Sequence, residues 1–337
     1  MAFGNVHVGA TQPTGSVSIT NTTVSNASYQ DSLNASASTN NLKVSGNSFT
    51  AQAAGATGSL TLTASTATAG SLASTVTLGY VSNANGVNGL SNSTLAGGSI
   101  TTTGQVYSGH SSWSGGSGSW GTLASGFGTN WGANQGSPGI DAGFSGVDTA
   151  SFNGAGGTVA LDGAAPSVNA LTLNGSGAYT LAQGSGGGLT MAGTIPGITA
   201  SGSNVISAGL SLASGTNVAV TGTLQLSGAI SGTALTKSGG GTLTVTGANL
   251  YTGGTSVNAG TLLVSNSSGS GTGTGAVTVA GGATLGGSGG TIGGAVNVSN
   301  LDRKIETTDF GVSSVERFHG MHGLRKSHEF FLNSPFG

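Results

Sequence analysis

The sequence has little of what nucleic-acid binders and membrane-spanning proteins require. Its 337 residues include no cysteine and 5 prolines, and only 5% are aromatic and 5% charged. The absence of cysteine excludes disulfide bridges. Residues 1–300 contain only Lys43 and Lys237 as cations, which excludes the basic patch of a nucleic-acid binder and a polybasic membrane-surface helix. No apolar run approaches the roughly 20 residues of a spanning helix.

Glycine is abundant instead, with 66 residues. Such a composition could indicate disorder, because ordering glycine and serine costs much entropy. However, the net charge is only −2, whereas disordered chains are usually highly charged, and Val, Leu and Ile fall in short alternating runs. The helix formers Glu, Lys and Arg are missing or rare before residue 301, and glycine interrupts every helical window. The composition therefore predicts a folded all-β chain.

Short runs of alternating residues predict β-strands throughout residues 1–300. Each run has period two, so that one face is apolar and the other carries Thr or Ser. Glycine, asparagine and serine separate the runs and permit tight turns. The clearest runs are residues 17–20, 60–63, 76–79, 171–173, 218–220, 224–226, 243–245 and 277–279.

Four segments differ in composition. Residues 1–108 are rich in Asn, Ser and Thr, with strand signals at the spacing of a β-sandwich. Residues 109–165 contain all three tryptophans, and residues 166–300 are the most repetitive. Residues 301–337 hold most of the charge, which predicts a separate irregular tail. We expect this tail to be disordered, frameshifted or a short terminal module.

The N-terminus has neither the basic region nor the apolar region of a signal peptide. If the protein is exported, we expect its signal to lie upstream of Met1. The chain is therefore expected to begin inside a longer protein and to be a fragment of it.

One segment of the repetitive region, residues 235–266, has a specific pattern. It begins Leu-Thr-Lys-Ser-Gly, continues through Gly-Thr-Leu-Thr-Val and Asn-Leu-Tyr-Thr-Gly-Gly-Thr, and reaches Val-Asn-Ala-Gly-Thr-Leu. This segment resembles the autotransporter-associated β-strand repeat, also called the passenger-associated transport repeat. The residues that carry the resemblance are Leu235, Lys237, Leu243, Val245, Tyr251, Gly253, Gly254, Val257 and Leu262.

The resemblance implies a right-handed parallel β-helix over residues 166–300, with residues 235–266 forming one rung. Each rung of a solenoid supplies an inward apolar stripe that stacks on the next rung. A single rung cannot bury its own stripe, so we expect degenerate rungs from Val168 to Ile230 and onward to Val298. The expected stripe consists of Leu243, Val245, Val257, Leu262 and Val264.

The same resemblance implies a function and a location. It predicts a structural passenger or stalk of an autotransporter-type bacterial protein, located at the cell surface or outside the cell. It also implies an outer-membrane translocator barrel as the partner, and the residues after Asn300 show no ten-residue alternating strands of such a barrel. We expect this chain not to be an enzyme and to need no cofactor.

A second, shorter resemblance lies at the N-terminus. The run Phe-Gly-Asn-Val-His-Val-Gly at residues 3–9, followed by Val-Ser-Ile-Thr-Asn-Thr at residues 17–22, resembles the opening of immunoglobulin-like choice-of-anchor domains. It implies an immunoglobulin-like β-sandwich spacer over residues 1–108.

The three tryptophans have two interpretations. Trp113, Trp120 and Trp131 could form a sugar-stacking platform, which would make the protein a carbohydrate-binding adhesin with glycans or other cell-surface proteins as partners. Alternatively they fill a domain joint or cap the first rung, where large aromatic side chains bury most area. Their surroundings resemble the lead-in that precedes such repeats, which favours the cap over residues 109–165.

The ionisable residues leave little room for catalysis. A β-helix polysaccharide lyase or hydrolase needs convergent carboxylates, usually with a cation, and residues 44–236 contain no Lys or Arg. Asp141, Asp148 and Asp162 are more typical of turns. A metal could bind the tail histidines, but solvated histidines are commoner, so we expect no metal site. These histidines are His319, His322 and His328.

Overall fold

The chain divides into two compact units, Met1–Ser108 and Gly109–Gly337. The computed structural model describes residues 1–23, 30–84, 91–121, 130–132, 135–299 and 311–312. Over these residues the one helical element is a 3-10 turn, η2 (Ala142–Phe144), and no helix there has the length and apolarity to cross a membrane. The prediction of an all-β chain is confirmed.

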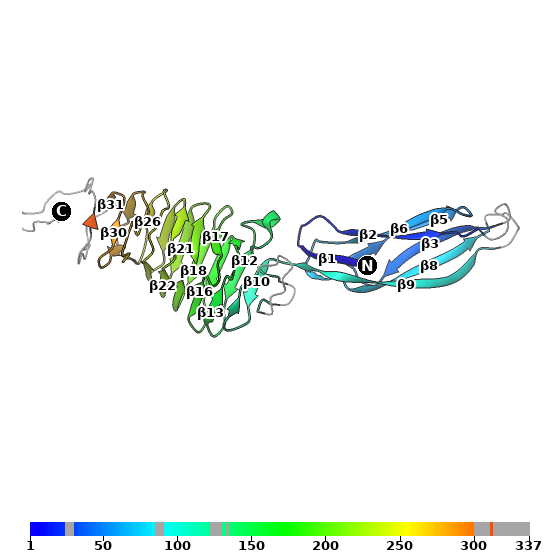
Figure 1. Cartoon of the computed structure of the whole chain (residues 1–337), viewed down its shortest axis with the longest axis horizontal. Coiled ribbons are helices and arrows are strands. Elements are labelled where there is room, and N and C mark those ends of the chain that lie inside the picture. Colours follow the sequence, from blue (N-terminus) through cyan, green and yellow to red (C-terminus); the bar gives the residue numbers. More distant parts are fainter. Residues whose placement is uncertain (24–29, 85–90, 122–129, 133–134, 300–310, 313–337) are drawn as a thin grey trace, which may run out of the picture. The chain divides into compact units, whose positions relative to one another are not determined.

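The first unit consists of a curled, mainly antiparallel sheet and a smaller three-stranded sheet (Figure 1). The larger sheet has the order β1–β9–β8–β3–β5, with β7 attached to β9, and the smaller one has the order β2–β6–β4. The strands are β1 (Ala2–His7), β2 (Thr14–Thr20), β3 (Ser32–Thr39), β4 (Val44–Gly46), β5 (Ser48–Gln52), β6 (Thr57–Ala64), β7 (Gly70–Ser71), β8 (Ser74–Asn83) and β9 (Ser93–Tyr107).

Period-two alternation decides which side chains of the first unit are buried. In β6, Leu60, Leu62 and Ala64 are buried, because successive side chains of a strand point to opposite faces. The runs at residues 17–20, 60–63 and 76–79 lie within β2, β6 and β8. The sheet is curled, and β1 pairs with β9 in parallel, so an immunoglobulin-like topology is not established and stays a prediction.

The second unit is a parallel β-solenoid, which confirms the predicted architecture; its handedness stays a prediction (Figure 1). The first sheet contains β10 (His110–Trp113), β12 (Thr149–Phe152), β15 (Ala170–Leu173), β18 (Gly197–Ala200), β21 (Thr216–Val220), β24 (Leu235–Ser238), β26 (Thr255–Val257), β28 (Val277–Val279) and β31 (Val296–Val298). The second contains β11 (Gly118–Ser119), β13 (Gly157–Ala160), β16 (Tyr179–Ala182), β19 (Ser203–Ile206), β22 (Thr223–Leu226), β25 (Thr242–Val245), β27 (Thr261–Val264) and β29 (Thr284–Gly286). The third contains β14 (Ser167–Val168), β17 (Gly188–Met191), β20 (Gly209–Leu212) and β23 (Ile230–Gly232). A separate pair is β30 (Thr291–Ile292) with β32 (Gly311–Val312).

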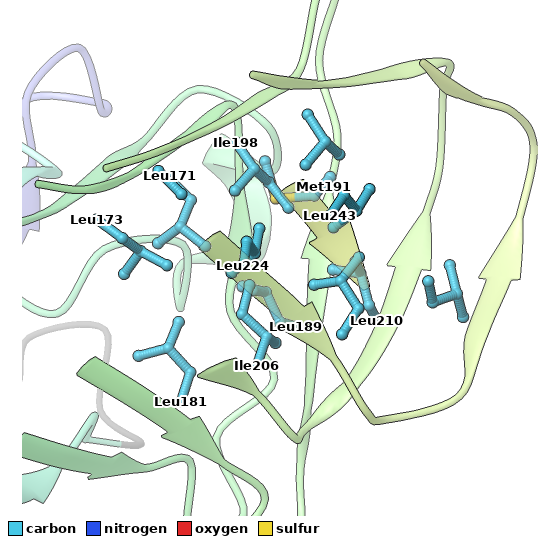
Figure 2. Close-up of a cluster of buried hydrophobic side chains, with 14 of the residues drawn as sticks. Leu171, Leu173, Leu181, Leu189, Met191, Ile198, Ile206, Leu210, Leu224 and Leu243 are labelled. Atoms are coloured by element: carbon cyan, nitrogen blue, oxygen red, sulfur yellow. The ribbon is translucent and has the colours of Figure 1, made fainter. Parts of the chain in front are cut away.

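Register-matched side chains form columns inside the solenoid. Figure 2 shows Leu171 of the first sheet, Leu224 of the second and Leu189 of the third in one shared interior. A column of the first sheet is Leu171, Ile198, Val218, Lys237, Val257 and Val279, and one of the second is Leu224, Leu243, Leu262 and Leu285. The stripe expected from the sequence (Leu243, Val245, Val257, Leu262 and Val264) lies in this interior, with each side chain at most 1% exposed.

Glycines at one corner let successive turns approach very closely. A Cβ atom added at Gly241 would lie 2.3 Å from the carbonyl oxygen of Gly222, and one added at Gly222 would lie 2.1 Å from that of Gly202. Real Cβ atoms do not approach backbone oxygens this closely, so only glycine fits this column without a shift of the backbone. The neighbouring Gly240 has nothing within 4 Å of its added Cβ.

We therefore expect Gly241→Ala to lower the free energy of unfolding of the solenoid by about 1–3 kcal/mol, the usual cost of overpacking. Gly240→Ala is the matched control and should change it by less than about 0.5 kcal/mol. Urea unfolding followed by tryptophan fluorescence measures this, because all three tryptophans belong to the second unit. Equal midpoints for the two variants would show that the corner is not tightly stacked.

Candidate functional site

The segment that resembles the repeat covers more than one turn of the solenoid. β24 and β25 belong to one turn, whereas β26 and β27 belong to the next. The first turn is complete where Thr255 pairs with Leu235. The expectation of a single rung is therefore corrected, because the unit includes a full turn and two strands of the turn that stacks on it.

The aliphatic residues that carry the resemblance point into the core. Leu235, Leu243, Val245, Val257 and Leu262 are each at most 1% exposed. Gly253 and Gly254 form the corner that leads into β26, and Gly254 has a φ of 84°, a conformation that favours glycine. Some polar residues of the segment, among them Lys237, Asn249 and Thr255, are also buried.

Lys237 lies in an otherwise apolar column, between Val218 and Val257, and is fully buried. Its ammonium group donates hydrogen bonds to the carbonyl oxygens of Ser238 at 2.8 Å, Gly239 at 2.7 Å and Ala259 at 3.0 Å. An ammonium has three donors, so its hydrogen-bonding capacity is filled. Burial lowers the pKa of Lys237. Because Ala259 belongs to the next turn, the side chain joins the corners of two turns.

Tyr251 and Thr255 form a buried polar pair at the corner before β26. The Tyr251 hydroxyl lies 2.6 Å from Thr255 Oγ1, and the two residues are 1% and 2% exposed. Burial raises the pKa of Tyr251 to about 12, while the hydrogen bond to Thr255 acts in the opposite direction. The phenol therefore stays protonated far above neutral pH.

Asn249 connects three successive turns. Its Oδ1 accepts a hydrogen bond from the Ile230 amide at 2.8 Å, in the preceding turn. Its Nδ2 donates to the Gly271 carbonyl at 2.7 Å, in the following turn. Buried backbone groups need partners, and here one side chain supplies a partner to each neighbour. Asn249 is 1% exposed, so these bonds are shielded from water.

Two further asparagines have comparable roles that the sequence analysis did not identify. Asn204 accepts a hydrogen bond from the Tyr179 amide at 2.9 Å, and Asn266 accepts one from the Thr291 amide at 3.0 Å. Asn204 lies inside β19, whereas Asn266 follows β27. Because their positions relative to the strands differ, no spacing in the sequence indicates this role.

The three tryptophans are buried together at the N-terminal end of the solenoid. Trp113, Trp120 and Trp131 are 3%, 0% and 5% exposed, and Trp131 packs edge-on against both others at 5.0 and 4.9 Å between ring centroids. Each indole N–H donates to a backbone carbonyl, those of Gly116, Pro138 and Trp120 respectively. A sugar platform needs an exposed ring face, so this burial favours the interpretation as a cap.

The backbone around Trp131 also covers the first strand of the solenoid. Trp113 and Trp131 form an antiparallel bridge, and the Gly132 amide donates to the Ser112 carbonyl at 3.0 Å. β10 therefore has partners on both sides, since β12 pairs with its other side. This return of the chain occupies a sheet edge that could otherwise pair with another chain.

The three aspartates bond to backbone amides at turns. Asp141 accepts from the Gly143 amide at 3.0 Å, and Asp162 from the Ser185 amide at 3.1 Å. Asp148 is 1% exposed and accepts from the Gly139 amide at 2.7 Å. Over the part of the chain that the structure describes, no three His, Asp or Glu side chains are placed to hold a metal ion. The histidines His319, His322 and His328 lie outside the described residues.

Comparison with known families supports the repeat. Residues 235–264 match the model of the passenger-associated-transport-repeat family, from the first residue of β24 to the last of β27. No curated protein and no solved structure matches the chain. The repeat identified from the sequence is confirmed, and its family implies a cell-surface or extracellular protein.

We expect Asn249→Ala to destabilise the solenoid by about 2–6 kcal/mol, because each of two buried backbone groups left without a partner costs about 1–3 kcal/mol. The two groups are the Ile230 amide and the Gly271 carbonyl. The exposed Asn258, which also belongs to the repeat, gives the control variant Asn258→Ala, with an expected change below about 0.5 kcal/mol. Similar urea midpoints for both variants would contradict the proposed role of Asn249.

The raised pKa of Tyr251 predicts a loss of stability at alkaline pH. Its pKa is 10.0 in the unfolded reference and about 12 in the folded protein, so the folded state keeps a proton that the unfolded state releases. Stability therefore falls as pH rises from 10 to 12, by about 2 kcal/mol over this interval. Tyr251→Phe should remove this component. If wild type and variant lose stability in parallel over this range, the assignment is wrong.

Proposed function

We propose that this chain is a structural passenger or stalk segment of an autotransporter-type bacterial surface or secreted protein. The transport repeat and the parallel solenoid support this proposal. The observation that carries it is the set of buried polar bonds in the repeat, of which those of Asn249 link three turns. In a solenoid each turn contacts only its neighbours, so such bonds stabilise the stacking locally.

The proposed mechanism is directional folding outside the outer membrane. A chain that crosses the membrane unfolded adds turns one at a time to those already folded. Each added turn buries its apolar stripe, which disfavours return through the membrane. The repeat strengthens this step, because Lys237, Asn249 and Tyr251 satisfy buried polar groups within it and between adjacent turns.

The partners follow from this mechanism. During export the partner is an outer-membrane translocator barrel, and afterwards the solenoid extends from the cell surface as a spacer. Contacts with host or environmental glycans, or with other surface proteins, belong to a different role, that of an adhesin. The buried tryptophans do not favour that role.

The enzymatic alternative, a polysaccharide lyase or hydrolase, finds less support than a structural role. Asp141, Asp148 and Asp162 each accept a hydrogen bond from a backbone amide at a turn, which accounts for their presence without catalysis. Release of products from pectin or alginate, abolished by Asp148→Asn, would contradict the structural proposal.

The test places the full chain between an export signal and an outer-membrane translocator in a Gram-negative host. We expect wild-type chain and Asn258→Ala to reach the surface equally, as measured by the fraction accessible to added protease on intact cells. Asn249→Ala should reach it several-fold less, because its repeat stacks less stably. Equal display of a demonstrably destabilised Asn249→Ala variant would show that folding of the repeat does not assist export.

A further inference from the structure

Two Asn-Gly pairs occupy equivalent corners of successive turns. Asn153-Gly154 follows β12, and Asn174-Gly175 follows β15. The strands pair in register up to Phe152 and Leu173, and the backbone amide of Asn174 donates a hydrogen bond to the Phe152 carbonyl at 3.1 Å. Both asparagines are exposed. The two pairs therefore share sequence, corner and exposure, so any difference in their chemistry must come from their surroundings.

The surroundings differ at the glycine amide. The Gly154 amide donates a hydrogen bond to the Tyr179 hydroxyl at 3.1 Å. Tyr179 is fully buried and packs against Phe152, so this bond is fixed in place. For the Gly175 amide, no hydrogen bond to any described residue is present. One of two equivalent backbone nitrogens is thus engaged, whereas the other has no hydrogen-bond partner among the described residues.

We propose that Asn174 is a site of spontaneous deamidation and that the Tyr179 hydroxyl protects Asn153 from the same reaction. The Gly175 nitrogen attacks Cγ of Asn174, and an N–Cγ bond forms. The Cγ–Nδ2 bond breaks, and the nitrogen leaves as ammonia with the proton from the Gly175 amide. Water then opens the succinimide ring at either carbonyl and yields aspartate or isoaspartate, so no oxidant, reductant or enzyme is needed.

Glycine favours this reaction because it has no side chain to obstruct the ring and the greatest backbone freedom. The product changes a stretch that has no acidic residue from residue 163 to residue 301. A carboxylate at position 174 would be the only one between residues 163 and 301. Isoaspartate would also lengthen the backbone between β15 and β16. The deamidated fraction at this corner of the solenoid would therefore increase with the age of the protein.

The experiment compares the two asparagines within one molecule. The full chain is incubated at mildly alkaline pH, folded or in urea, and then digested with chymotrypsin. Trypsin is unsuitable because residues 44–236 contain no Lys or Arg. Cleavage after Phe152, Leu161, Leu173 and Tyr179 places the two asparagines in separate peptides. Liquid chromatography coupled to mass spectrometry then separates and measures the aspartate and isoaspartate forms of each peptide. The pairs Asn85-Gly86 and Asn88-Gly89 lie outside the described residues and are measured separately.

In the folded chain we expect Asn174 to deamidate about fivefold faster than Asn153, the rate factor that corresponds to one ordinary hydrogen bond. In urea the two rates should be similar. Tyr179→Phe keeps the buried ring but frees the Gly154 amide, so it should raise the rate at Asn153 and leave Asn174 unchanged. Equal rates in the folded wild-type chain, or no effect of Tyr179→Phe on Asn153, would overturn the proposal.

Discussion

The close stacking of one turn of backbone on the next is the constraint on which the rest of the solenoid depends. Parallel strands lie about 4.8 Å apart, and the corners must keep to the same spacing as the strands. At Gly222 and Gly241 this leaves no space for a Cβ atom. Glycine is therefore abundant in this unit for a steric reason as well as for flexibility. With the corners so close, the side chains of each turn stack directly on those of its neighbours.

The same stacking explains why polar side chains can lie inside an otherwise apolar interior. Corner carbonyls and amides of adjacent turns are brought within reach of one side chain, as they are for Lys237 and Asn249. A buried polar group is tolerated when its hydrogen-bonding capacity is satisfied. The repeat is thus one place where turns are joined by specific bonds as well as by apolar contact, which suits a segment that must fold in a fixed register.

At the N-terminal end of the solenoid, the first strand has no preceding turn to stack on. An uncovered first strand would expose backbone groups that can pair with another chain. Here the return of residues 130–132 bonds to β10, and Trp113, Trp120 and Trp131 cover the interior behind it. The large apolar area of the tryptophans covers the interior at that end, which explains why all three lie in one short segment.

The sequence by itself determined the all-β class, the solenoid and the position of the repeat, because period-two alternation and a specific motif are local properties of the chain. It also predicted the inward stripe from Leu243 to Val264. Only the tertiary structure decided that the repeat extends over two turns, that Asn204 and Asn266 bridge turns, and that the tryptophans are buried. It also distinguished Asn153 from Asn174. These properties depend on which residues of neighbouring turns meet, and that is fixed by register and corner geometry rather than by local pattern.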